Sequence, residues 1–151
     1  MATKYRGSDA EVRALNALIN LMRASDAVAA DLQRWISKKR LTGSQFGILE
    51  VLLHLGPLYQ GELAAKLLRS GASVTSVVEG LEKRELVVRQ RTEEDKRFVR
   101  VALTSKGRKL IEEIFPGHAK AVAKLFGGLT DQEQEELRRL CRKLGVAAGR
   151  G

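Results

Sequence analysis

The chain has 151 residues, and its 27 Lys and Arg against 18 Asp and Glu give a net charge of +9. This length fits one ordinary domain, or a small domain with an attached dimerisation element, and it can bury a core without a metal or a disulfide. The single cysteine excludes an intrachain disulfide and a Cys-based zinc site, and the basic charge suggests a polyanionic partner, either nucleic acid or an anionic membrane.

The N-terminal residues lack the charged-then-apolar pattern of a signal peptide. No apolar run approaches the roughly 20 residues that a membrane span needs. We therefore expect a soluble, cytoplasmic protein with no membrane partner.

The first predicted element is one long helix over about residues 9–38. Ser8 and Glu11 have the spacing of a capping box at its start. At 1.5 Å per residue the helix spans about 45 Å, which is too long for one compact small domain and indicates a dimer scaffold. Its apolar positions recur at helical spacing: Leu15, Leu18, Ile19, Met22, Ala29, Leu32 and Ile36.

Three shorter helices follow. Thr42 and Gln45 form a second capping box, and Gly56-Pro57 ends the helix that it opens. Two short amphipathic segments, 60–68 and 72–84, are separated by a turn that contains Gly71. Two short helices joined in this way are typical of a helix-turn-helix.

A β-hairpin is predicted directly after the helix-turn-helix. Residues 86–91 are rich in strand-forming side chains, and residues 98–103 alternate with a period of two. The wholly polar segment 92–97 lies between them. A hairpin in this position is a wing, so residues 41–104 are predicted to form a winged helix-turn-helix DNA-binding lobe.

Two further helices complete the chain. One begins at Thr104 and ends at Gly127-Gly128, and Pro116 inside it is expected to kink or break it. Thr130 and Glu133 form a third capping box before a last helix. On its apolar stripe Cys141 is expected to be a buried, inert thiol. The fold class is thus mainly α with a small β-hairpin wing, and residues 8–40 and 105–146 form an all-helical dimerisation lobe.

The N-terminal half of the second helix of a helix-turn-helix faces the base edges in the major groove. Here that half carries Ser73, Thr75 and Ser76, whose short hydroxylated side chains suit close approach to bases and phosphates. The same residues could simply cap and solvate the helix.

The tip of the predicted wing carries Asp95, Lys96 and Arg97. A cation on a projecting hairpin can enter the narrow minor groove, where the negative potential is enhanced, and Asp95 could hold the Arg97 side chain. A solvated turn of mixed charge is the alternative. Further cations flank the tip: Arg89, Arg91 and Arg100.

The ordered set of motifs resembles the MarR family of transcriptional regulators over roughly residues 10–145. The match that carries most weight is TEEDKRFVRVALTSKG, residues 92–107, which resembles the family's wing followed by Leu-Thr and Gly. The other matching motifs are Leu41-Thr42, Gln45-Phe46, Leu49, Glu62-Leu63-Ala64, Ser73-Val74-Thr75 and Leu81-Glu82-Lys83.

The resemblance implies a homodimer that reads a pseudo-palindromic operator in double-stranded DNA, and many members of the family repress the genes that they control. It places Ser73, Thr75 and Ser76 against DNA, and it makes Asp95 the brace of a minor-groove Arg97. It also implies release by a small phenolic or otherwise amphipathic effector. Two positions depart from the family pattern, since Glu85 stands where glycine is frequent and Lys96 where a second wing arginine is frequent.

For such an effector, Trp35, His54 and Tyr59 are the aromatic or polar-tipped residues expected nearest the cleft, although each is more typical of a core or a surface. Two other functions compete with DNA binding. An enzyme is disfavoured because His54 and His118 are isolated among apolar neighbours, with no metal-ligand spacing and no nucleotide loop. A winged helix that binds protein is disfavoured because the wing keeps its cations. We expect neither cofactor nor metal.

Overall fold

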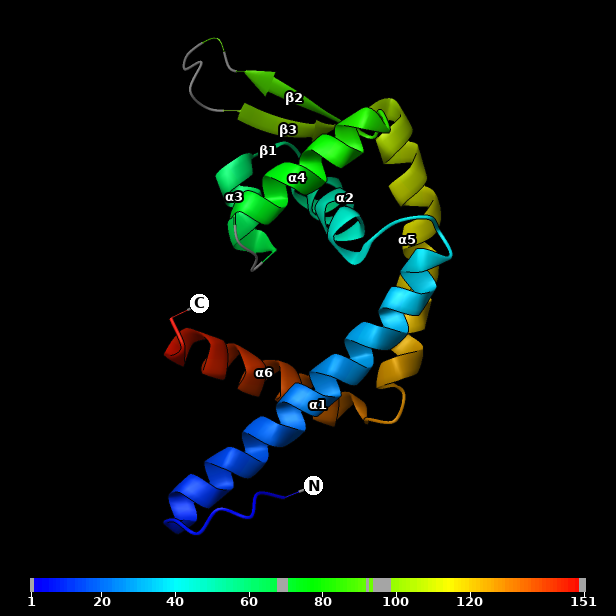
Figure 1. The fold of residues 1–151 in the computed structure, drawn as a ribbon. Helices are drawn as coiled ribbons and strands as arrows, with labels where there is room; N and C mark the ends of the chain where they lie inside the picture. Colours follow the sequence, from blue (N-terminus) through cyan, green and yellow to red (C-terminus); the bar gives the residue numbers. More distant parts are fainter. Residues whose placement is uncertain (1, 68–70, 92, 94–98, 150–151) are drawn as a thin grey trace. The chain divides into compact units, whose positions relative to one another are not determined.

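The computed structural model describes residues 2–67, 71–91, 93 and 99–149. Figure 1 shows its elements in chain order: α1 (Asp9–Ser37), α2 (Gly43–Leu55), β1 (Leu58–Tyr59), α3 (Gln60–Lys66), α4 (Gly71–Lys83), β2 (Val87–Arg91), β3 (Val99–Leu103), α5 (Ser105–Phe126) and α6 (Asp131–Ala147). They fall into two compact units, Met1–His118 and Ala119–Gly151. The predicted fold class, mainly helical with a small antiparallel sheet, is confirmed.

The three predicted capping boxes are all present, at the starts of α1, α2 and α6. At α1 the Ser8 backbone N–H donates to the Glu11 carboxylate over 2.7 Å, and the Glu11 N–H donates back to the Ser8 hydroxyl over 3.3 Å. The backbone and hydroxyl donors of Ser8 lower the pKa of the Glu11 carboxyl below its ordinary value. Each box satisfies backbone donors that a helix start would otherwise leave unpaired, which explains why these three boundaries could be predicted.

α5 runs without a break from Ser105 to Phe126 with Pro116 inside it. The structure thus contradicts a break at Pro116, whereas the kink that was the other expected effect stays a prediction. Proline removes one backbone hydrogen bond and crowds the preceding turn, which destabilises a helix locally. Ile111 and Ile114, in the turns just before it, are buried in the core, and their burial outweighs that local cost.

The sheet has three antiparallel strands in the order β1-β3-β2. β2 and β3 form the predicted hairpin, with Arg89 opposite Val101 and Arg91 opposite Val99. β1 was not predicted, because a two-residue strand is too short to show a period of two. It pairs Tyr59 with Arg100 and so attaches the segment before α3 to the base of the hairpin.

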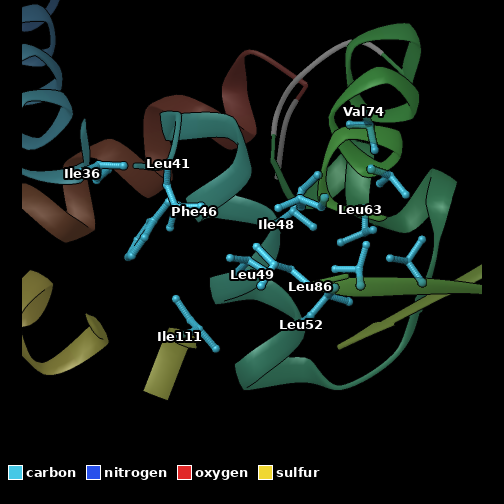
Figure 2. Packing of buried hydrophobic residues seen from close by; sticks show 14 of the residues in the cluster. Ile36, Leu41, Phe46, Ile48, Leu49, Leu52, Leu63, Val74, Leu86 and Ile111 are labelled. Atoms are coloured by element: carbon cyan, nitrogen blue, oxygen red, sulfur yellow. The ribbon is translucent and has the colours of Figure 1, made fainter. Parts of the chain in front are cut away.

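One hydrophobic core fills the first unit, with α2 at its centre (Figure 2). Ile48, Leu49 and Leu52 of α2 are almost completely buried. Each such side chain contributes about 2 kcal/mol relative to an exposed position. The remaining core residues come from α1, α3, α4, α5 and the sheet, and include Ile36, Leu63, Val74, Val78, Leu81, Val87, Val101 and Ile111. This shared core fixes α3, α4 and the strands on α2.

α6, in the second unit, has an apolar stripe and no buried residue among those described. Leu137, Leu140 and Leu144 are all exposed. Cys141, on the same stripe, is exposed too, so the predicted burial of this thiol is not met within one chain. Within the described residues we find no helix with the length and apolarity that a bilayer crossing requires.

Candidate nucleic-acid interface

α3 and α4 form the helix-turn-helix. Val74, Val78 and Leu81 of α4 are buried, so this face of the helix is fixed on the core. Ser76 lies half a turn away from Val74 and is exposed, which leaves it accessible to a ligand of the helix surface. Ser76 is thus exposed, as its expected role requires, and its contact with DNA stays a prediction.

Thr75, which is expected to contact DNA, also makes a hydrogen bond within the protein. The side-chain amide of Gln60, at the start of α3, donates to the Thr75 hydroxyl oxygen over 2.5 Å. This bond joins the N-terminal end of α3 to the N-terminal half of α4. Gln60 was not identified from the sequence, because nothing in a local pattern marks a hydrogen bond between residues 15 positions apart.

The wing is attached to α4 through Arg89. Its guanidinium lies 2.8 Å from the Glu82 carboxylate and 3.9 Å from that of Glu79, and the Arg89 backbone N–H also donates to Glu82 over 3.3 Å. The Arg89 side chain is only 34% exposed. Arg89 is thus an anchor for the hairpin, and its charge is balanced within the protein.

Arg91 is the exposed cation of β2. It stands two residues beyond Arg89, so its side chain projects from the same face of the strand, farther from the core. Within the described ranges no hydrogen bond or ion pair of its side chain is found. Among the described residues Arg91 thus has no balancing anion, and it lies on the face of β2 from which Arg89 contacts α4.

Arg100 lies on the opposite face of the hairpin. Its guanidinium donates to the Pro57 carbonyl over 3.3 Å and lies 5.6 Å from the centre of the Tyr59 ring, the distance of a cation–π contact. Tyr59 is paired with Arg100 across β1 and β3 and is exposed. These contacts hold β1 against the hairpin.

Four of the expected DNA-contacting side chains cannot be placed. Asp95, Lys96 and Arg97 lie outside the described residues, and Ser73 lies in α4 but its side chain is outside the described part. Of the expected set, the structure thus brings Thr75, Ser76 and Arg91 to one lobe, on a recognition helix and the strand beside it.

Of the three residues expected near an effector, Trp35 and His54 lie in one group of aromatic rings, whereas Tyr59 lies in the sheet. Trp35 packs edge-on against Phe46, and both rings contact His118, at 5.7 Å and 4.5 Å between ring centroids. Phe115 lies 5.9 Å from His118 and 4.8 Å from His54. These five rings, which we call the aromatic cluster, connect α1, α2 and α5. Tyr59 is not among them.

Three features distinguish the aromatic cluster from an ordinary core. The Nδ1 atom of His118 is buried and has no hydrogen-bond partner among the described residues. The Lys39 ammonium lies 5.5 Å from the Trp35 ring centroid. Gly117 admits the Trp35 ring to the α5 backbone, since a Cβ there would lie 2.9 Å from Trp35 Cζ2. A buried acceptor or donor among aromatic rings, with a cation at the edge, suits a planar polar ligand.

The sequence did not reveal this arrangement. His54 and His118 were interpreted as isolated, yet both belong to the aromatic cluster and both contact Phe115. Phe46, Phe115 and His118 were missed as its members. The described residues contain no group of three or more His, Cys, Asp or Glu side chains arranged to hold a metal ion.

Comparison with known proteins identifies the family. The MarR family matches residues 41–97. The HTH-type transcriptional regulator MhqR of Bacillus subtilis is 30% identical over 136 residues, covering 90% of this chain and 94% of MhqR. The chain belongs to the MarR family. The resemblance predicted from the sequence is confirmed, and the exposed face of α4 with the adjoining wing is the helix-turn-helix surface of a transcriptional regulator.

Solved structures agree with this assignment. BpsR of Bordetella bronchiseptica superposes with a TM-score of 0.78 at 31% identity, covering 85% of this chain and 98% of BpsR. Sco3205 of Streptomyces coelicolor, a MarR family regulator solved in complex with DNA, has a TM-score of 0.84 at 24% identity, covering 95% of this chain and 91% of Sco3205. The second of these likenesses concerns the fold alone.

Proposed function

We propose that this MarR family chain acts as a homodimer that binds a pseudo-palindromic operator in double-stranded DNA and represses transcription. The observation that carries the proposal is the geometry of the first unit. The core fixes the inner side of α4, and Gln60 bonds to Thr75 in its N-terminal half. Ser76 on α4 and Arg91 on β2 stay exposed. A positioned, open helix next to a basic hairpin is what reading a groove requires.

Within this function each expected contact has a chemical role. Ser73, Thr75 and Ser76 approach bases and phosphates in the major groove, where hydroxyls accept or donate. Arg91 contacts a backbone phosphate. Arg97 enters the minor groove beside Lys96 with Asp95 as its brace, the roles that the family resemblance gives to the wing tip.

The dimer would be formed by residues 8–40 and 105–146. The support is apolar surface that one chain leaves uncovered, because exposed leucines and a methionine recur along α1 and α6: Leu18, Leu21, Met22, Leu137, Leu140 and Leu144. Contiguous exposed apolar faces of this kind mark protein–protein interfaces. Two recognition helices related by a twofold axis read half-sites about one helical turn apart.

An effector would bind at the aromatic cluster, with Trp35 and His54 among its contacts. BpsR, the structural relative at 31% identity, has its DNA binding regulated by 6-hydroxynicotinic acid, an aromatic acid with a hydroxyl group. The aromatic cluster supplies flat rings for stacking, the unpartnered His118 Nδ1 for a hydrogen bond and Lys39 for a carboxylate. We infer a planar, amphipathic effector. Tyr59 belongs to the sheet and would not contact it.

This function makes the chain a regulator without catalytic activity, active in the cytoplasm where its operator lies. Support comes from its family, which consists of transcriptional regulators, and from the packing of both histidines against aromatic rings. Turnover of a substrate by the purified protein would contradict the first statement.

The test is selection of duplexes from a random DNA library at physiological salt, followed by sequencing. We expect a pseudo-palindrome with half-sites about 10 base pairs apart. Salt-sensitive binding without any motif would contradict sequence specificity. Recovery of no DNA would favour the protein-binding winged helix. Addition of 6-hydroxynicotinic acid and related hydroxylated aromatic acids to the selected duplex then tests release.

A further inference from the structure

The C-terminal end of the recognition helix is tied to the junction between α1 and α2. Arg84 follows directly after α4, and its Nη1 donates to the Arg40 carbonyl over 2.9 Å and lies 3.4 Å from the Gln45 side-chain oxygen. We call this three-residue contact the Arg84 bridge. Its partners are 44 and 39 residues away in sequence, so the bridge joins parts of the chain that no local pattern links.

Both partners of Arg84 are themselves fixed. Arg40 has a φ of 60°, a left-handed conformation that turns the chain sharply after α1. Gln45 belongs to the capping box of α2, where its side-chain oxygen also accepts the Thr42 backbone N–H over 3.0 Å. Arg84 therefore binds two oxygen atoms in fixed positions: the Arg40 carbonyl oxygen after the end of α1, and the Gln45 side-chain oxygen at the start of α2.

Gly80, one helical turn before Arg84, shows that α4 lies along the same side chain. A Cβ at residue 80 would come within 3.7 Å of Gln45 Nε2, an ordinary van der Waals distance. The N-terminal end of α4 has its own tie, from Gln60 to Thr75. The recognition helix is thus held at one end to α3 and at the other to the start of α2 and the end of α1.

We propose that Arg84 is a positioning residue that sets the direction of α4 relative to α1. This inference rests on the proposed function, because α1 is the helix that would join the two protomers. If α1 fixes the dimer axis and Arg84 fixes α4 on α1, the bridge sets the separation and tilt of the two recognition helices. It would thereby select the spacing of the operator half-sites without contacting DNA.

The alternative is that Arg84 only adds local stability or positive charge. Lys83 provides a matched control, since it is adjacent, exposed and equally charged, and the described residues show no bond of its ammonium. Lys83→Ala removes the same charge from the same end of α4 and leaves the Arg84 bridge intact. Arg84→Ala removes one positive charge and also the Arg84 bridge.

The first measurement needs no DNA. Trp35, the single tryptophan of the chain, is a donor on α1, and an acceptor dye on Ser76→Cys in a Cys141→Ser background reports on α4. Labelled chain is mixed with an excess of unlabelled Trp35→Phe chain. Each labelled protomer then pairs with a partner that has neither tryptophan nor dye, so energy transfer occurs only within one chain. Time-resolved energy transfer should give a broader distance distribution for Arg84→Ala than for the parent or Lys83→Ala. An equally narrow distribution would overturn the inference.

The second measurement uses the selected operator with its half-site spacing changed by one base pair at a time. Arg84→Ala should reduce the preference for the best spacing over its neighbours by about tenfold, the factor expected from one lost charge-assisted hydrogen bond. Lys83→Ala should keep the preference while weakening all spacings alike. An unchanged preference in Arg84→Ala would overturn the inference even if the distances broaden. Failure of the parent to select any duplex would instead contradict the proposed function, and the energy-transfer experiment would still decide whether Arg84 positions α4.

Discussion

Gly107 packs directly against the backbone of Leu86: a Cβ at residue 107 would lie 1.9 Å from the Leu86 carbonyl oxygen. Thr104 completes this joint, because its hydroxyl donates to the Glu85 carbonyl over 2.6 Å and accepts the Gly107 N–H over 3.0 Å. The end of α4, the start of the hairpin and the start of α5 therefore meet at one point. The glycine that follows Leu-Thr in the sequence has a steric reason to be there.

Gly107→Ala should destabilise the protein severely. The added Cβ would meet a backbone carbonyl, which no change of rotamer can move. The free energy of unfolding should therefore fall by about 3 kcal/mol, at the upper end for an overpacked site. For a chain of this size the melting temperature should fall by roughly 6–12 °C. Gly61→Ala is the matched control, because nothing lies within 4 Å of a Cβ there and alanine favours the helix interior. Equal melting temperatures for the two variants would contradict the steric argument.

Glu85→Gly should stabilise the protein. Glu85 has a φ of 59°, and the N–H groups of Glu85 and Leu86 donate to the carbonyls of Glu82 and Leu81, which is the Schellman end of a helix. A side chain in this conformation costs about 1 kcal/mol or more, partly offset by the greater freedom of glycine in the unfolded chain. We expect a net gain of about 0.5–1 kcal/mol in chemical denaturation.

The contact that Glu85→Gly removes is worth little. Lys106 Nζ lies 3.4 Å from the Glu85 carboxylate, but the two side chains are 62% and 82% exposed. Glu85→Ala separates the two effects, since it deletes the ion pair and keeps the strained Cβ. If Glu85→Ala were as stabilising as Glu85→Gly, the left-handed backbone would not be the cause.

The elements that sequence predicted well are those with local chemical signals. The capping boxes at Ser8, Thr42 and Thr130 mark helix starts within one turn of chain, and the alternation after residue 98 marks β3. Local signals thus gave the order and nearly all boundaries of the elements.

What sequence could not predict depends on contacts between distant residues. The aromatic cluster joins Trp35, Phe46 and His118, whose separations along the chain exceed any helical or strand period. The bonds from Gln60 to Thr75 and from Arg84 to Arg40 have the same character. The fold could therefore be predicted from the sequence, whereas the residues that position α4 and gather the rings required coordinates.

Substitution on the apolar stripe of α6 should break the proposed dimer. Leu140→Lys places a charge in the middle of the face that Leu137 and Leu144 share, where burial against a partner would leave it unpaired. We expect the mass in sedimentation to shift from dimer to monomer, with helical content retained. Glu135→Lys is the control on the polar side of the same helix, where it also introduces a lysine but replaces an exposed pair with Arg138 by two neighbouring cations. A Leu140→Lys protein that stays dimeric would remove α6 from the interface.

Arg91→Ala should make DNA binding less dependent on salt concentration, by an amount that the number of lost phosphate contacts predicts. Each phosphate contact contributes about 0.9 to the slope of log K against log salt concentration, so the two Arg91 side chains of a dimer should account for about 1.8. Arg91→Lys keeps the charge and should keep the slope, even if affinity falls with the loss of the planar guanidinium. Arg89 should contribute little, because Glu82 and Glu79 already balance its charge. The measurement is a set of binding isotherms for the parent, Arg91→Ala and Arg91→Lys at several salt concentrations. If the slope for Arg91→Ala equalled that of the parent, this side of the wing would not contact the phosphate backbone.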